Sequence, residues 1–475
     1  MESSQRNHSP FYFLDGWVVL LAVIVGGTLV WLSVGRYRSY NAGMLDLGNM
    51  SQAVWSATQG RPLECTYGDG TLSRLAHHVE LIYFLLAPLY AAFPSPITLL
   101  VLQAVLYASG SFPLFLFAHR RLQHKWAARL IVLSYLLYPA ALTSVLFDFH
   151  GDTLAMPLLL FAFEALDRHS VRCYAVWLVL ALACKFYVSV PVVVYGLVLY
   201  ASGKRRVGTL TAIAGGLWFV IVFLVIRPHF APDVHVPPEA TTLGYLGVYF
   251  GRVRELFTTP GMLVPRLLTA FIVFAPGVWL CRYALKWLVP AVAVGLPALA
   301  TAGLVAAYDY RFHHYALVVP FVLLSSIEGA AYLRQRKCRH WLLDVGMQAA
   351  IVVLFATIFV DTPLSPFYWA SPPGWGRDAW AYGVTARDAV KDQWLKDNVP
   401  DAVPTMASFF LAPHLASRSV LFMPQIRDEP GQPAGEDLLD RRLGAIDYVV
   451  LDALFDYTAP SEVPQPGGSP RSSAI

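Results

Sequence analysis

The chain has 475 residues, of which 56% are hydrophobic and only 14% charged, and its 35 Lys and Arg against 31 Asp and Glu give a formal charge of +4. Soluble domains carry about 25% charged residues, so this composition excludes a disordered or fibrous chain and a cytosolic enzyme, and it predicts an all-α polytopic membrane protein. The small positive excess predicts no nucleic-acid partner, because the distribution of Lys and Arg between membrane loops accounts for it.

Apolar runs predict about eleven transmembrane helices, because about 17–25 apolar residues cross the hydrocarbon core of a bilayer. In chain order these runs are residues 17–34, 97–118, 127–147, 153–166, 172–184, 187–201, 207–227, 265–281, 287–307, 315–333 and 341–360. A further run, residues 79–93, is short and interrupted by Pro88. We expect it to lie in the outer interface of the membrane.

Basic turns predict the orientation of these helices. Three turns carry ten Lys and Arg and no acidic residue between them: His119–Lys125, Lys204–Arg206 and Arg334–His340. Short loops rich in Lys and Arg stay in the cytoplasm, and all three can do so only if residues 79–93 do not span. The sequence therefore predicts a multi-pass protein of the inner cell membrane, with a cytoplasmic N-terminus and an extracytoplasmic C-terminal region.

The sequence divides into three parts. Residues 1–360 form the predicted transmembrane domain, with a large first outer loop at residues 35–96. Residues 361–458 carry one helical pattern and three short apolar runs typical of strands, at 405–411, 419–423 and 447–451, which predict a small extracytoplasmic α/β cap. Residues 459–475 are rich in Pro, Gly and Ser and are expected to be disordered.

The outer loops hold most of the unusual polar residues. Asp46 lies just after the first span, where it is either a helix cap or a general base or metal ligand. The segment Phe147–Asp152 places Asp148, His150 and Asp152 at the mouth of two helices. Asp152 can serve as a cap, whereas Asp148 and His150 are harder to explain in that way, and ionisable groups near the membrane tend to be functional.

Histidine–acid groups suggest a divalent metal ion. His77 and His78 lie near Glu80, and His313 and His314 lie near Asp309. Imidazole and carboxylate ligands suit Zn²⁺ or Mn²⁺, and Asp46, Asp148 and His150 are the candidate ligands. The alternative is that these histidines simply face the wet interface.

Cationic and tyrosine side chains in the outer loops suggest anion binding. Lys185 and Arg311 suit a phosphate or diphosphate head group. The alternative is that both side chains extend to the head groups of bulk lipid. Tyr187, His78 and His314 lie close to these cations or to the acidic residues in the sequence and are candidate substrate-binding residues.

Several motifs together resemble an uncharacterised family of multi-spanning prokaryotic membrane proteins, catalogued as a domain of unknown function. The resemblance covers about residues 40–455, and its motifs are Asp46-Leu47-Gly48, His78-Val79-Glu80-Leu81, Tyr138-Pro139, Phe147-Asp148-Phe149-His150, His314-Tyr315, Pro413-His414-Leu415 and Asp447-Tyr448-Val449. That family is similar in layout to the GT-C glycosyltransferases, in which acidic residues occupy the first large outer loop and the next outer turn. Asp46 and Asp148 stand in those places. One departure is Phe186, because relatives often carry an acidic residue after the lysine.

The resemblance implies transfer of a sugar from a polyprenyl-phosphate-linked donor to an extracytoplasmic glycan, lipid or protein acceptor. Asp46 would deprotonate the acceptor, Asp148 and His150 would orient it or complete a metal shell, and Lys185 and Arg311 would hold the departing phosphate. The alternative is a non-enzymatic lipid or polysaccharide transporter. Few charges lie deep in the spans, which disfavours a proton-coupled transporter.

Overall fold

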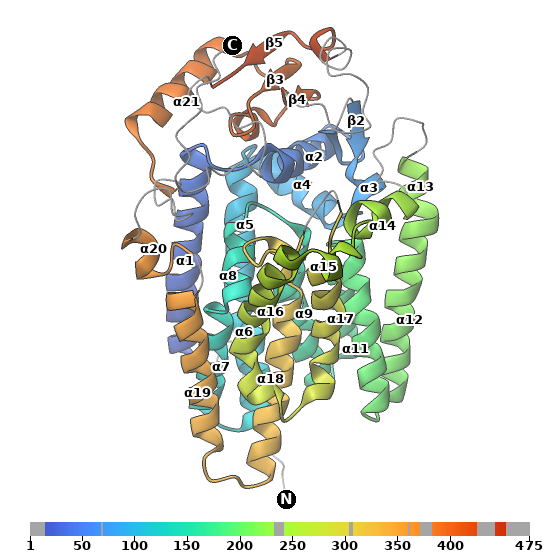
Figure 1. Ribbon diagram of the computed structural model, residues 1–475, viewed down its shortest axis with the longest axis vertical. Helices are drawn as coiled ribbons and strands as arrows, with labels where there is room; N and C mark the ends of the chain where they lie inside the picture. The colour runs from blue at the N-terminus through green and yellow to red at the C-terminus, as the bar shows by residue number, and fades with distance from the viewer. Residues whose placement is uncertain are drawn as a thin grey trace, which may run out of the picture.

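The computed structural model describes residues 15–67, 70–231, 242–303, 307–359, 362–370, 382–424 and 442–452. Long helices run side by side along the length of the molecule, and the short strands gather at one end, near the C-terminus (Figure 1). The last residues predicted as a disordered tail lie outside the described residues.

Each of the predicted apolar runs contains a helix in its described part, although the run 287–307 is helical only as far as Ala300 and the run 127–147 is broken at Leu137 and Tyr138. The helices of the bundle are α1 (Gly16–Arg38), α5 (Pro96–Ser109), α6 (Ser111–Leu122), α7 (Lys125–Leu136), α8 (Pro139–Leu146), α9 (Gly151–Asp167), α10 (Val171–Leu182), α11 (Ser189–Ala201), α12 (Arg205–Ile221), α16 (Pro260–Cys281), α17 (Val289–Ala300), α18 (Val318–Gln335) and α19 (Trp341–Leu354).

By length and composition, fewer than the eleven predicted helices could cross a membrane. Among the described residues, six helices are long and apolar enough to cross, or seven if the pair α7 and α8, bent by 44°, counts as one span. The bend falls before Pro139, because a proline disfavours helical geometry in the residue that precedes it. Helices α10 and α11 have only 12 and 13 residues, about 18–20 Å at 1.5 Å per residue.

The first outer loop folds into short elements on the bundle. They are a π-helical turn η2 (Met44–Gly48), α2 (Asn49–Thr58), the hairpin β1 (Glu64–Tyr67) and β2 (Gly70–Ser73), α3 (Arg74–His77) and α4 (Ile82–Ala92). Helix α4 corresponds to the run expected in the interface, and its 11 residues are too few to cross a core of about 30 Å. Further short elements are η3 (Phe186–Val188), η4 (Val222–Ile226), α13 (Arg227–Phe230), α14 (Thr242–Phe250), α15 (Glu255–Thr258), η6 (Leu285–Trp287), η7 (His313–Tyr315) and η8 (Phe355–Phe359).

The C-terminal unit consists of a small parallel sheet and a helix. Its elements are α20 (Pro366–Ala370), α21 (Ala386–Asn398), β3 (Thr405–Ala407), η10 (Ala412–Leu415), β4 (Leu421–Phe422) and β5 (Tyr448–Val450), with strand order β4-β3-β5. The strands lie within the three apolar runs predicted as strands. Their buried side chains form a second, smaller core with Tyr40 and Met44 of the first outer loop, so this unit packs on the loop that carries Asp46.

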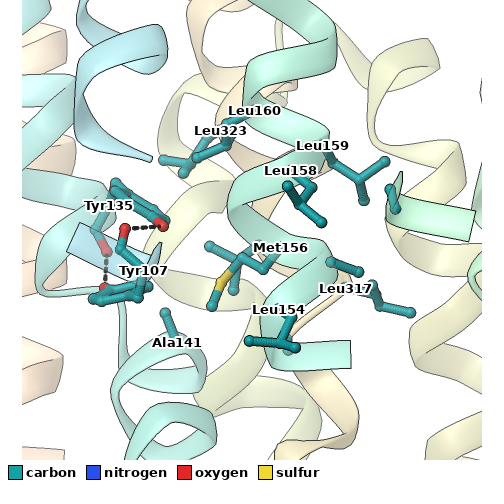
Figure 2. Close-up of a cluster of buried hydrophobic side chains, with 14 of the residues drawn as sticks. Tyr107, Tyr135, Ala141, Leu154, Met156, Leu158, Leu159, Leu160, Leu317 and Leu323 are labelled. Atoms are coloured by element: carbon teal, nitrogen blue, oxygen red, sulfur yellow. Dashed lines mark hydrogen bonds between the residues drawn. The ribbon is translucent and has the colours of Figure 1, made fainter. Parts of the chain in front are cut away.

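The main core lies between α5, α7, α8, α9 and α18 (Figure 2). Two buried tyrosines there form a reciprocal pair of hydrogen bonds. The hydroxyl of Tyr107 donates to the backbone carbonyl of Tyr135, and the hydroxyl of Tyr135 donates to that of Tyr107, both at 2.8 Å. A buried hydroxyl without a partner is costly, so this reciprocal pair keeps the apolar interior free of that penalty. The helices of this core carry the polar residues described below at one end.

Candidate functional site

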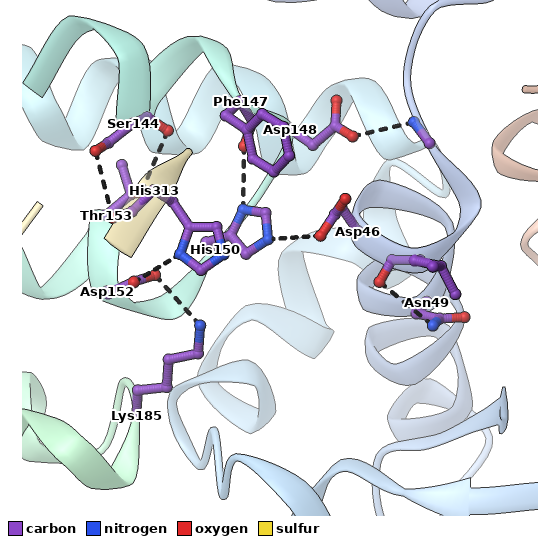
Figure 3. Close-up of polar contacts among 12 residues, drawn as sticks. Asp46, Asn49, Ser144, Phe147, Asp148, His150, Asp152, Thr153, Lys185 and His313 are labelled. Carbon is purple, nitrogen blue, oxygen red and sulfur yellow. Dashed lines mark hydrogen bonds and ion pairs between the residues drawn. The ribbon is translucent and has the colours of Figure 1, made fainter. Parts of the chain in front are cut away.

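Four segments far apart in the chain meet at the end of the bundle that was predicted to face outward (Figure 3). They are the π-helical turn η2, the turn between α8 and α9, the turn η3 after α10, and η7 before α18. Single π-helical turns occur frequently at functional sites. Here η2 carries Asp46, whose side chain is 28% exposed and is therefore the accessible carboxylate of the cluster.

Asp46 and His150 form an acid–imidazole pair although 104 residues separate them. The Nε2 atom of His150 lies 3.0 Å from Oδ1 of Asp46, and Nδ1 lies 3.0 Å from the carbonyl of Phe147. A carbonyl only accepts, so Nδ1 carries a hydrogen, and the contact between Nε2 and Oδ1 of Asp46 requires one further proton between those two atoms. A proton shared between Nε2 and Oδ1 therefore holds the pair together.

A second acid–imidazole pair stacks on the first. The rings of His150 and His313 lie face to face with centroids 3.5 Å apart, and Nδ1 of His313 lies 2.7 Å from Oδ2 of Asp152. Asp152 is fully buried. The two pairs thus connect the exposed carboxylate of Asp46 to a carboxylate in the interior.

Asp152 also receives two further donors from the turn after α10. The Tyr187 hydroxyl donates to its Oδ2 at 2.6 Å, and Nζ of Lys185 lies 3.4 Å from Oδ1. Gly151 makes this approach possible, because a Cβ there would lie 2.1 Å from the carbonyl oxygen of Cys184. Lys185 is nearly fully buried, so its charge belongs to the site and does not extend to bulk lipid.

Asp148 faces a different set of partners from Asp46. Its Oδ1 lies 3.4 Å from Nη1 of Arg36 at the end of α1, and its Oδ2 accepts from the backbone N–H of Gly43 at 3.0 Å. Asp148 has φ +50°, a left-handed conformation that Asp tolerates better than most residues. Through these two contacts Asp148 connects the end of α1 and the loop that follows it to the turn that carries His150.

The surroundings of Asp46 and Asp148 shift the pKa values of their carboxyl groups in opposite directions. Burial opposes ionisation of Asp46, but the hydrogen bond and charge of His150, together with the nearby Arg36 and His314, outweigh it and hold the pKa of this carboxyl below its ordinary value. Burial raises the pKa of Asp148, and Arg36 offsets only part of that effect. Burial also lowers the pKa of His314 to about 4, so its imidazole is neutral near pH 7.

A cationic neighbourhood adjoins Lys185. The side chain of Arg227 is buried, donates from Nε to the carbonyl of Ala76 at 3.2 Å, and lies 5.5 Å from the ring of Phe186. The ring of His78 lies 4.0 Å from that of His77. Among the described residues, neither nitrogen of His77 has a hydrogen-bond partner. Burial lowers the pKa of both histidines well below its ordinary value, which leaves them neutral.

Two overlapping sets of side chains have donor atoms close enough to hold a metal ion. One set is Asp46, His150 and His313, the other is Asp152, His313 and His314, and within each set the atoms lie within 4.8 Å of one another. The contact between Nδ1 of His150 and a carbonyl, and that between Nδ1 of His313 and a carboxylate, are the kind that orient metal-bound imidazoles. The sequence proposed Asp148 as a third ligand, whereas the structure places His313 beside Asp46 and His150.

The remaining predicted residues lie in other environments. Arg311 is exposed and binds Asp309, with Nη2 and Oδ2 2.6 Å apart. Glu80 binds Arg74 at 2.8 Å in a buried ion pair instead of joining the histidines. Sequence reasoning underrated Asp152, because a carboxylate at the start of a helix is usually explained as a cap.

The fold and this site together define a polytopic membrane protein of GT-C-like layout, with its polar cluster at one end of the bundle. The chain matches the model of the family described as predicted membrane protein (DUF2079) over residues 36–466, and it belongs to that family. No curated protein matches it.

Two solved structures of one protein share the fold. The structure of ArnT from Cupriavidus metallidurans bound to undecaprenyl phosphate has a TM-score of 0.52 and 13% identity, and the match covers 91% of this chain and 90% of ArnT. The apo state of ArnT gives a TM-score of 0.51 at 13% identity, over 86% and 85% of the two chains. At this identity the likeness establishes the fold alone.

Proposed function

We propose that this protein is an integral membrane glycosyltransferase that transfers a sugar from a polyprenyl-phosphate-linked donor to an extracytoplasmic acceptor. The observation that carries the proposal is the position of Asp46, a partly exposed carboxylate paired with His150 beside buried cations. The fold shared with ArnT, a protein solved with undecaprenyl phosphate bound, supports a lipid-linked donor.

Asp46 is the proposed general base. The acceptor hydroxyl gives its proton to the carboxylate of Asp46 as its oxygen attacks the anomeric carbon of the sugar. The bond from that carbon to the phosphate oxygen breaks, and the phosphate leaves with the electron pair. A single displacement of this kind inverts the anomeric centre. The pair with His150 holds the carboxylate in position, and a positioned base contributes about 10²–10⁴-fold to such a reaction.

Lys185 is the proposed partner of the departing phosphate. Fixed cations stabilise charge that develops in the transition state most strongly where water is excluded, and Lys185 is 1% exposed. Arg227 adds a second buried cation to the same region of the molecule. Phe186 stands where relatives often carry an acid, and it packs against Arg227 without adding a negative charge there.

A divalent cation is compatible with the same residues. Asp46, His150 and His313 would hold it, and a bound ion would supply Lewis-acid activation of the acceptor hydroxyl. His150 would then present its Nε2 lone pair to the ion. The metal-free and metal-assisted forms share the requirement for Asp46.

The proposed orientation places this site outside the cytoplasm. The three basic turns lie at the end of the bundle opposite α2, the helix that follows Asp46 in the chain (Figure 1), as expected if that end is cytoplasmic. The C-terminal unit is then extracytoplasmic and covers the loop that carries Asp46, where it can contact an acceptor.

The proposal is tested by measuring the amount of lipid-linked sugars in cells with and without the protein. Cells lacking the protein are expected to accumulate a polyprenyl-phosphate sugar, measured by mass spectrometry of lipid extracts, and to lose one envelope glycan modification. Wild-type protein restores both, and Asp46→Asn restores neither although it inserts normally. An unchanged lipid-linked pool in cells that lack the protein would contradict the proposal.

A further inference from the structure

A cavity lies at the end of the bundle opposite the Asp46 site. Its volume is about 350 Å³, within the range of ligand pockets. It is formed by the ends of α6, α9, α11 and α18 and by η6, and its lining includes Arg121, Ser202, Lys204, Lys286, Trp287 and Tyr332.

Helix α9 fixes the distance between this cavity and the site. Asp152 at the start of the helix binds His313, and Asp167 at its end lines the cavity. The helix rises about 1.5 Å per residue, so the step from Asp152 to Asp167 spans about 22 Å. The cavity therefore lies near the opposite boundary of a hydrocarbon core of about 30 Å, where lipid head groups begin.

The charges that line the cavity leave a positive excess. Its two acidic residues are both matched by arginines, since Asp167 binds Arg120 at 2.8 Å and Glu328 binds Arg121. Lys204 and Lys286 line the same space, and among the described residues neither forms an ion pair with a carboxylate. These two lysines come from separate turns, so the fold brings two cations to one cavity.

The walls of the cavity combine aromatic surface with one unsatisfied polar group. Trp287 and Tyr332 are among its aromatic residues, and such residues are enriched at membrane interfaces. Ser202 also lines the cavity, and its buried Oγ has no hydrogen-bond partner in the described part of the chain. A ligand with acceptor oxygens would satisfy this hydroxyl.

We propose that this cavity binds a phosphate ester group, which the adjacent membrane supplies as the head group of an anionic lipid. Lys204 and Lys286 hold the phosphate, the Ser202 hydroxyl donates to one of its oxygens, and Trp287 and Tyr332 contact the glycerol and the first acyl carbons. Basic pockets between transmembrane helices on the cytoplasmic side bind anionic head groups in this way. This inference does not depend on the proposed glycosyl transfer.

Lipid titration of the full-length protein tests this site. The protein is placed in nanodiscs of zwitterionic phosphatidylcholine, and phosphatidylglycerol is then substituted in steps while the melting temperature and the lipids retained in native mass spectra are recorded. A parallel arm adds inorganic phosphate to the phosphatidylcholine nanodiscs. We expect phosphatidylglycerol to raise the melting temperature and to be retained, with an apparent affinity at least tenfold weaker in the double variant Lys204→Gln, Lys286→Gln.

The control double variant is Lys337→Gln, Arg339→Gln, which removes two exposed charges from the same end of the bundle without touching the cavity lining. It is expected to keep its affinity within about twofold. Stabilisation by inorganic phosphate alone, again lost in the Lys204 and Lys286 variant, would assign the site to a soluble phosphate ester. Equal responses of the two double variants would overturn the proposal, because they would show attraction to general surface charge only.

Discussion

His150 and His313 stack with their ring planes 16° apart and their centroids 3.5 Å apart. In the sequence they are far apart, because His150 precedes α9 and His313 follows α17. Each imidazole has its own carboxylate, Asp46 or Asp152. Two imidazolium rings at this distance would repel strongly, so the stack requires at least one neutral ring.

Replacing Asp46 with Asn is expected to lower the rate of sugar transfer by about 10²–10⁴-fold, because it removes the proposed base without changing the shape of the side chain. The rate is measured by release of the polyprenyl phosphate. Glu64→Gln is the matched control, since Glu64 is similarly exposed, at 29% against 28%, and lies in the same outer loop. Equal losses in the two variants would remove Asp46 from the chemistry.

Replacing Lys185 with Gln is expected to weaken binding of a short-chain polyprenyl phosphate by at least tenfold, as for loss of a charged hydrogen bond of about 1.5–3 kcal/mol. Arg311→Gln is expected to change it less than threefold, because the Arg311 side chain is exposed and its charge is screened by water. Titration of the purified variants measures both. The reverse order of effects would transfer the phosphate site to the turn at Arg311.

Replacing Asp148 with Asn is expected to destabilise the fold by about 3–5 kcal/mol, because it leaves Arg36 without its largely buried charge partner. The accompanying change Arg36→Gln should recover part of this loss, which a double-mutant cycle of thermal unfolding would reveal. Additive losses would show that the two side chains do not interact. Asp148 would then have to act through its hydrogen bond with Gly43 alone.

Acid is expected to loosen the C-terminal unit through His414. This imidazole stacks between Tyr37 and Tyr40 and its Nε2–H donates to the carbonyl of Tyr37 at 3.0 Å. Burial lowers its pKa from 6.5 to about 3, so the unfolded unit takes up a proton at a higher pH than the native one. Stability is complete above pH 6.5 and falls by about 1.4 kcal/mol per pH unit below it.

Hydrogen exchange of β3 at pH 7 and pH 5, corrected for intrinsic rates, measures this effect of acid. In His414→Phe the ring stack is kept and the titrating group is removed, so the pH dependence should disappear even if the variant is less stable throughout. Exchange that accelerates equally in both proteins would assign the effect to another group.

Much of the architecture was predictable, because long apolar runs have few alternatives to a helix in a membrane. The outer-loop positions of Asp46 and His150 predicted a common site, but not the hydrogen bond between them. The role of Asp152 was hidden for a physical reason. Its partners Lys185 and His313 lie 33 and 161 residues away, and no local pattern reports a contact set by packing of α9 against η3 and η7.

The number of membrane spans was the weakest prediction from the sequence. Hydrophobicity marks an apolar run but does not show whether that run forms one long helix or two shorter ones. The run at 127–147 read as one helix, yet it bends by 44° before Pro139. Tyr138 at the bend donates to the carbonyl of Val273 at 2.7 Å, a contact that only the folded bundle supplies. Pro139 is the sequence cue to this bend, and the prediction of a single helix did not use it.

The attachment of the C-terminal unit determines how substrates reach Asp46. The side-chain amide of Gln52 donates to the carbonyl of Arg418 at 2.9 Å, and the hydroxyl of Thr66 accepts from the N–H of Leu421 at 2.9 Å. With the His414 contact, these bonds fasten the unit to the first outer loop at separate points. It cannot swing aside as a hinged lid without breaking them all, so the proposed lipid-linked donor would have to reach Asp46 from the side, between helices and from within the bilayer.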